Sequence, residues 1–209
     1  MKNLKKLVGG YKEFLEKNYQ AHMRGLAEHG QSPKIMVIGC SDSRVNPELI
    51  FNTKPGDLFM VRNVANLVPP YESDDGHHGT SAALEFAVDV LGVQHIVVMG
   101  HSSCGGVKAC CDKLHGHMIE GRFIRQWTSI LNACAQEVKS ANPDLPEGEF
   151  YTKVEQAAIA ASLLNLEGFP FIKARLNSGD LMLHGAYFDI GSTQLYALDH
   201  DTHVFMPVE

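Results

Sequence analysis

The sequence predicts an α/β fold with a mainly parallel central sheet flanked by helices. We expect about four parallel strands, an antiparallel C-terminal edge strand and an N-terminal helical arm. Two apolar runs, Ile35–Ile38 and Ile96–Met99, stop at a glycine and have the composition of buried parallel strands. A helical pattern precedes the second run, and a strand, a helix and a strand form a right-handed parallel crossover. Alternation over Leu181–Phe188 and Gln194–Leu198 predicts an edge hairpin.

Length and composition indicate one ordinary globular domain. The chain has 209 residues, 44% apolar and 20% charged, so we expect a single domain over residues 1–209 in which residues 1–30 form the arm. The net charge of -6 gives no support to binding of nucleic acid or an anionic membrane. Five cysteines, two of them adjacent, argue against a disulfide framework, and no apolar stretch approaches ~20 residues. We therefore expect a cytoplasmic protein.

The first half of the chain alternates helices and strands. Residues 1–29 have a helical pattern with a bend at Gly9-Gly10, and this arm packs either on its own core or on a second subunit. The elements expected next are a strand over Lys34–Gly39, a short helix from Asn46-Pro47 to Phe51, a strand over Asp57–Arg62, a helix from Thr80 to Gly92 and a strand over His95–Met99.

The second half is more helical. Gly105-Gly106 open a helix that runs to about Leu114, and residues 122–140 are expected to be helical. Thr152 and Glu155 suggest a capping box after a loop over Asn142–Glu149. That helix should end at Gly168, and Phe171–Ala174 is expected to be a strand before the hairpin.

Metal-ligand residues follow both apolar runs. Cys40 comes after Gly39, and His101 and Cys104 come after Gly100. If the two strands lie side by side, these three residues converge at their carboxyl ends, where open α/β sheets bind ligands. Two thiolates, one imidazole and one open position suit a catalytic zinc site. The alternative is that the cysteines are small core residues and the histidine belongs to a capped loop.

Asp42 and Arg44 stand beside the first cysteine. A carboxylate at a strand end can be a fourth metal ligand, or an acceptor that the arginine holds in a bidentate pair. An ordinary loop salt bridge would also explain the pair, but it would not explain its position beside a metal ligand.

These motifs resemble those of the β-class carbonic anhydrases. The resemblance rests on Cys40-Ser-Asp42-Ser-Arg44, on His101-Ser-Ser-Cys104-Gly-Gly and on Val61–Asn66, and it extends from about Gln31 to the terminal hairpin. It implies a parallel-sheet α/β fold, a Zn²⁺ cofactor and reversible hydration of CO2 to bicarbonate and a proton. It also implies an obligate homodimer, or a multiple of it such as a homotetramer, in which the arm embraces the partner.

The resemblance also assigns roles to single residues. The metal ligands are Cys40, His101 and Cys104, the catalytic pair is Asp42 and Arg44, and the substrate pocket takes Gln31, Phe59, Val64, Phe86 and Gly105. In this reading Asp42 orients a zinc-bound hydroxide toward CO2, and it ligates zinc only if a closed state forms. Gln31 and Val37 point to the plant-like subclass whose site stays open. Phe86 replaces a common tyrosine, and Ala186 replaces a frequent tryptophan, which leaves the assembly size open.

Two other functions fit the same ligands. One is hydrolysis of CS2 or COS, which turnover on CO2 and on CS2 would distinguish. The other is a catalytically silent zinc-binding module, against which the intact Asp42 and Arg44 argue.

Overall fold

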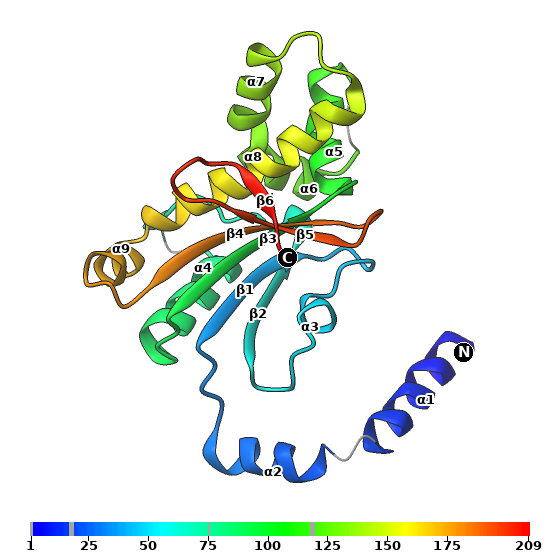
Figure 1. Cartoon of the computed structure of the whole chain (residues 1–209), viewed down its shortest axis with the longest axis vertical. Coiled ribbons are helices and arrows are strands. Elements are labelled where there is room, and N and C mark those ends of the chain that lie inside the picture. Colours follow the sequence, from blue (N-terminus) through cyan, green and yellow to red (C-terminus); the bar gives the residue numbers. More distant parts are fainter. Residues whose placement is uncertain (1, 17–18, 75, 118–119) are drawn as a thin grey trace.

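A six-stranded mixed sheet forms the centre of the protein, in the order β2-β1-β3-β4-β5-β6 (Figure 1). The structure is a computed structural model that describes residues 2–16, 19–74, 76–117 and 120–209. The parallel strands are β2 (Leu58–Asn63), β1 (Ile35–Cys40), β3 (His95–His101) and β4 (Met182–Asp189), and the antiparallel ones are β5 (Gln194–Leu198) and β6 (Phe205–Pro207). The predicted fold class is confirmed.

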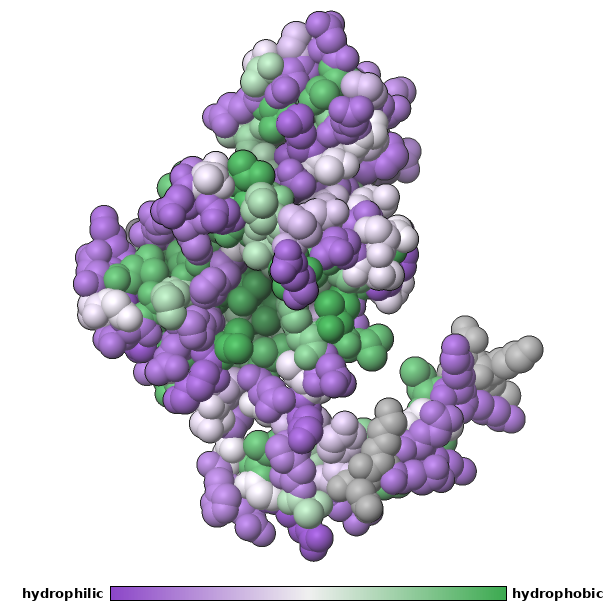
Figure 2. Space-filling view, viewed as in Figure 1, coloured by the Kyte–Doolittle hydropathy of each residue, from purple (hydrophilic) through white to green (hydrophobic). Residues whose placement is uncertain are grey.

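Helices cover the two faces of the sheet unequally. On one face α4 (Gly79–Glu85), the π turn η2 (Phe86–Val90), α8 (Glu147–Glu167) and α9 (Pro170–Asn177) pack on strand residues such as Ile38 and Val98. On the other face α3 (Pro47–Ile50) lies against a smaller cluster around Val37 and Met99. In Figure 2 apolar surface gathers over the strands in the middle of the body.

A helical knob extends beyond the carboxyl ends of the parallel strands. It consists of α5 (Gly105–Leu114), α6 (Arg122–Thr128), the 3₁₀ turn η3 (Ser129–Leu131), α7 (Asn132–Ala141) and the start of α8 (Figure 1). The residues expected to be helical over 122–140 are so, in two helices separated by η3. A further 3₁₀ turn, η1 (Val64–Asn66), follows β2 at the base of the knob.

The N-terminal arm extends away from the body (Figure 1). It comprises α1 (Lys2–Glu16) and α2 (Gln20–His29), so the predicted bend at Gly9-Gly10 is wrong and the helix continues through both glycines. Leu7 and Tyr11 of α1 are 70% and 60% exposed in the single chain. Contact with the body is made by α2, where His22 Nε2 lies 2.7 Å from the Pro55 carbonyl oxygen.

Two further predictions about elements are wrong for identifiable reasons. Phe171–Ala174 is not a strand but part of α9, because Pro170 occupies a first-turn position and starts a helix there. Thr152 and Glu155 form no capping box, since α8 already begins at Glu147. In addition, the predicted terminal hairpin is not at the edge, because β4 pairs with β3 and β6 lies outside β5.

Among the described residues, no helix is both long and apolar enough to cross a membrane.

Candidate metal centre

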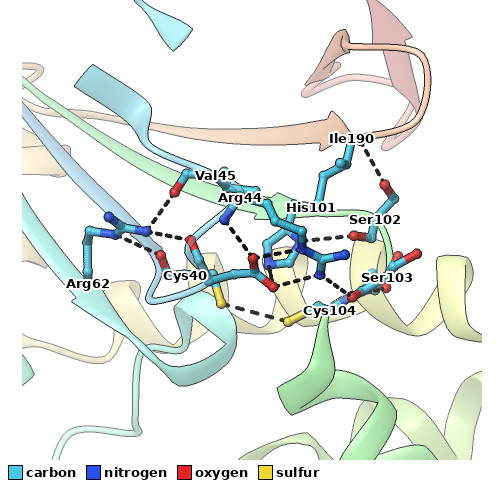
Figure 3. A network of polar contacts seen from close by, with 11 residues as sticks. Cys40, Arg44, Val45, Arg62, His101, Ser102, Ser103, Cys104 and Ile190 are labelled. Carbon is cyan, nitrogen blue, oxygen red and sulfur yellow. Dashed lines mark hydrogen bonds and ion pairs between the residues drawn. The ribbon is translucent and has the colours of Figure 1, made fainter. Parts of the chain in front are cut away.

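Cys40, His101 and Cys104 come together at the carboxyl ends of β1 and β3 (Figure 3). Their ligand atoms all lie within 4.8 Å of one another, and the two sulfurs are 3.9 Å apart. The side chains are almost fully shielded, with residue exposures of 5%, 1% and 1%. The convergence predicted from the two apolar runs is therefore present.

The local backbone explains this convergence. Parallel pairing of Gly39 with Met99 puts the ends of β1 and β3 side by side. Ser103 then adopts a φ of 57° in the turn that follows His101, and Cys104 becomes the N-cap residue of α5. A Cβ atom at Gly106 would lie 2.7 Å from a Val64 methyl, so only glycine lets α5 approach η1 this closely.

The donor set fits a zinc ion. The Nδ1 of His101 donates to the Ser102 carbonyl (2.9 Å). Its Nε2 is buried, has no hydrogen-bond partner in the part of the chain that the structure describes, and so has a free lone pair. Two thiolates ~2.3 Å from one tetrahedral zinc ion would lie roughly 3.8 Å apart, close to the separation between Cys40 and Cys104. The contact between the sulfurs lowers the pKa of Cys40 and raises that of Cys104, so a shared cation is needed for both to be thiolates.

Asp42 and Arg44 form a bidentate pair beside the ligands. Asp42 Oδ1 accepts from the backbone N–H and the Nε of Arg44, both at 2.9 Å, and Oδ2 accepts from Nη2 at 2.7 Å. Arg44 thereby holds the pKa of Asp42 well below its ordinary value. Asp42 Oδ2 lies 4.0 Å from His101 Nε2, so an ionised acceptor faces the ligand cluster.

A second arginine, Arg62, forms hydrogen bonds with the backbone of the loop that carries this pair. Arg62 donates through Nε to the carbonyl of Cys40 (2.8 Å) and through Nη2 to those of Asp42 (2.7 Å) and Val45 (2.6 Å) (Figure 3). Sequence reasoning did not identify this role, because backbone carbonyl acceptors leave no trace in residue identity.

Buried Glu155 accepts a hydrogen bond from the backbone of Cys104. It is only 4% exposed, and its Oε1 accepts the Cys104 N–H at 2.8 Å, while Oε2 accepts the hydroxyl of Tyr187 at 2.8 Å. Burial raises the pKa of this carboxyl group. Sequence reasoning assigned Glu155 to a capping box and so missed this role. The sequence did contain a signal for it, an acidic residue among the buried apolar positions of a helix.

The residues expected in the substrate pocket divide into two groups. Val64 and Gly105 lie beside the cluster, and the Val64 carbonyl accepts from a tryptophan in α6 at 2.7 Å. Phe59 and Phe86 stack with ring centroids 5.8 Å apart. Phe59 lies four residues before the carboxyl end of β2, which places it about 13 Å along the strand from that end at ~3.3 Å per residue. Gln31 precedes β1, at the opposite end of the strand from Cys40. In a single chain, therefore, the five residues expected in the substrate pocket do not all lie beside the cluster.

Comparison with known proteins identifies consistent relatives. The family model described as "Carbonic anhydrase" matches residues 35–195. The chain is 42% identical over 168 residues to the chloroplastic β carbonic anhydrase 5 of Arabidopsis thaliana, covering 80% of this chain and 54% of that protein. It is 38% identical over 207 residues to a carbonic anhydrase of Synechocystis, covering 97% of this chain and 74% of that protein. The chain thus spans about half the length of the chloroplastic relative.

Solved structures agree with these sequence matches. The β-carbonic anhydrase CcaA superposes with a TM-score of 0.91 at 33% identity, covering all of this chain and 93% of that one. A tetrameric β-carbonic anhydrase from Sordaria macrospora superposes with a TM-score of 0.80 at 28% identity, covering 95% of this chain and 98% of that one.

Proposed function

This chain belongs to the carbonic anhydrase family, in its β class, and from that membership we propose that it catalyses the reversible hydration of carbon dioxide to bicarbonate and a proton. Proteins of the class are zinc enzymes, and the Cys-His-Cys cluster can hold that ion. The observation that carries the proposal is the ionised Asp42 beside the cluster, because a purely structural zinc site needs no acceptor there.

The zinc ion and the residues around it would have different roles in this reaction. Bound zinc supplies a Lewis acid that lowers the pKa of a coordinated water from ~15.7 toward about 7. Asp42 can only accept hydrogen bonds because Arg44 keeps it ionised, so its Oδ2 holds the proton of the attacking water and turns an oxygen lone pair toward carbon dioxide. The Arg44 Nη2 also donates to the Ser103 carbonyl (3.0 Å), which ties the pair to the ligand turn. Val64 offers an apolar wall to an uncharged substrate.

The rest of the proposed pocket comes from a second copy of the chain. Gln31, Phe59 and Phe86 are far from the cluster of their own chain, yet Phe86 is 42% exposed. A homodimer that sets this surface against the cluster of the other copy would complete the pocket with two aromatic rings and an amide donor. Exposed Leu7 and Tyr11 on the arm favour an arm that packs on the partner. A dimer or dimer of dimers is therefore part of the proposal.

We place the chain in the open-site subclass. The bidentate contacts between Asp42 and Arg44 support an arrangement in which the carboxylate stays on the arginine. Val37 is 1% exposed inside the sheet, and its side chain has no N–H group with which to bind an anion. Activity should accordingly show no cooperative inhibition by bicarbonate.

Stopped-flow hydration of CO2 with a pH indicator tests the function on the purified, zinc-loaded chain. We expect rapid acidification that disappears when the metal is removed and returns with zinc. No rate above the buffer background, with full zinc occupancy and the native oligomer, would refute the proposal. Turnover of CS2 without turnover of CO2 would refute it in favour of a CS2 or COS hydrolase.

A further inference from the structure

The turn that follows β3 is fastened to the turn that follows β4. Ser102, next to the ligand His101, donates its backbone N–H to the carbonyl of Phe188 at 3.0 Å. Its hydroxyl donates to Asp189 Oδ1 at 2.8 Å and accepts from the N–H of Ile190 at 2.8 Å. Both the main chain and the side chain of Ser102 are thus held by three consecutive residues of the β4–β5 hairpin. The proposed reaction uses none of these contacts.

Asp189 is itself held in place. Its Oδ1 also accepts from the N–H of Gly191 at 3.0 Å, and its Oδ2 accepts from the hydroxyl of Ser192 at 2.7 Å. Hydrogen bonds from Ser192, Ser102 and Gly191 lower the pKa of this carboxyl group. Asp189 is therefore an ionised acceptor with a fixed direction.

The carbonyl of Ser102 determines which nitrogen of the His101 imidazole carries the proton. It can only accept, so the His101 Nδ1 that lies 2.9 Å away must be the protonated nitrogen. This assigns the lone pair to Nε2, which is buried and has no hydrogen-bond partner among the described residues. The next residue, Ser103, is in the left-handed region, which is unfavourable for a residue other than glycine. A turn of this kind depends on contacts outside itself to keep its carbonyls in place.

We propose that Ser102 and Asp189 are positioning residues for the metal ligand His101. The hairpin fixes Ser102, the Ser102 carbonyl fixes the tautomer and the ring plane of His101, and Nε2 is thereby aimed at the ion. The inference rests on the proposed zinc-dependent function. Hydrogen-bonding partners of metal-bound histidines commonly affect metal affinity or activity by 10–100-fold.

The rate at which zinc leaves the full-length, zinc-loaded protein tests this role, with a chromogenic chelator as the probe. Ser102→Ala should release zinc roughly 10–100-fold faster than wild type. Ser102→Thr keeps the hydroxyl and should release it at close to the wild-type rate. Ser178→Ala is the matched control, because it removes a serine hydroxyl that donates to a different aspartate, Asp180 Oδ2 at 2.7 Å, and leaves Ser102 and Asp189 untouched. It should leave the release rate unchanged.

A second variant removes the acceptor instead of the donor. Asp189→Ala should release zinc about as fast as Ser102→Ala, and the double variant should be no faster than either, since both break the same link. If Ser102→Ala does not fold, Asp189→Asn takes its place, and its neutral acceptor should still give faster release than Ser178→Ala.

Two results would overturn the inference. One is unchanged zinc release from Ser102→Ala. The other is equal acceleration of zinc release by Ser178→Ala, or acceleration that only follows the loss of thermal stability in the metal-free variants. A general destabilisation of the fold would produce either result. Zinc release does not depend on turnover, so a wild-type protein that fails to hydrate CO2 would refute the proposed function without altering this result.

Discussion

Replacing Asp42 by asparagine isolates the proposed acceptor. Asparagine has nearly the same shape, and its oxygen can still accept from the backbone N–H and the Nε of Arg44, as Oδ1 does now. Its NH2 group would then occupy the Oδ2 position, 2.7 Å from the donor Nη2 of Arg44 and 4.0 Å from Nε2 of His101. The position that faces the ligands would change from an acceptor to a donor.

The structure sets the size of the effect. At least one charge-assisted hydrogen bond is lost, and such bonds contribute about 1.5–3 kcal/mol. If that loss falls on the transition state, kcat should decrease roughly 10- to 150-fold. Zinc content should not change, because none of the three proposed ligands is altered. The pKa of Asp42 in the folded protein is held well below its ordinary value of 3.8, so the carboxylate is ionised throughout the neutral range. The ratio between variant and wild type should therefore be constant from about pH 6 to 9.

Stopped-flow kcat and metal analysis on the same samples measure this prediction. Asp57→Asn is a suitable control, since Asp57 Oδ2 accepts a backbone N–H at 2.7 Å in an exposed loop. It should leave kcat unchanged. A fully zinc-loaded Asp42→Asn enzyme with kcat within twofold of wild type would show that Asp42 is only structural.

Three other expectations concern the ligands, the packing and the pH profile. Cys40→Ser and His101→Ala should each lose zinc and activity together, and full zinc by metal analysis in both would contradict the assigned site. Gly106→Ala should destabilise the protein by about 1–3 kcal/mol in urea unfolding, because its Cβ would lie 2.7 Å from Val64. Gly105→Ala is the control, since its Cβ would meet no described atom within 4 Å, and equal stabilities of the two variants would contradict this packing. Hydration activity should rise through and above neutral pH, because two thiolates offset the formal charge of zinc, and a profile already flat at pH 6 would be inconsistent with that.

The sheet and the convergence of the three proposed ligands were predictable because they depend on local signals. Apolar runs that stop at a glycine identified β1 and β3, and direct parallel pairing of these two strands places Cys40 near His101 and Cys104. By contrast, the strand expected over Phe171–Ala174 rested on four apolar or long side chains, and the first-turn signal of Pro170 outweighed them.

Other features depend on tertiary contacts that residue types do not encode. Arg62 binds backbone carbonyl groups, and Glu155 binds a backbone N–H and the hydroxyl of Tyr187, 32 positions away, so the sequence does not reveal these contacts. The separation of Phe59 from the cluster follows from strand register, which becomes visible only once β1 and β2 are paired. The Ser102–Asp189 contact joins residues 87 positions apart.

The sequence separation of the proposed ligands determines how damage to the fold would first be detected. Cys40 and Cys104 are 64 residues apart, and β2, α4 and β3 lie between them. A zinc finger, whose ligands occupy a few tens of residues, can be excised as a peptide, but this centre exists only while β1 and β3 pair in register. Slight displacement of buried strand residues such as Ile38 or Val98 would shift one ligand against another before the chain loses its cooperative fold. Metal occupancy should thus be an early indicator of damage in the core, including damage from substitutions far from any ligand.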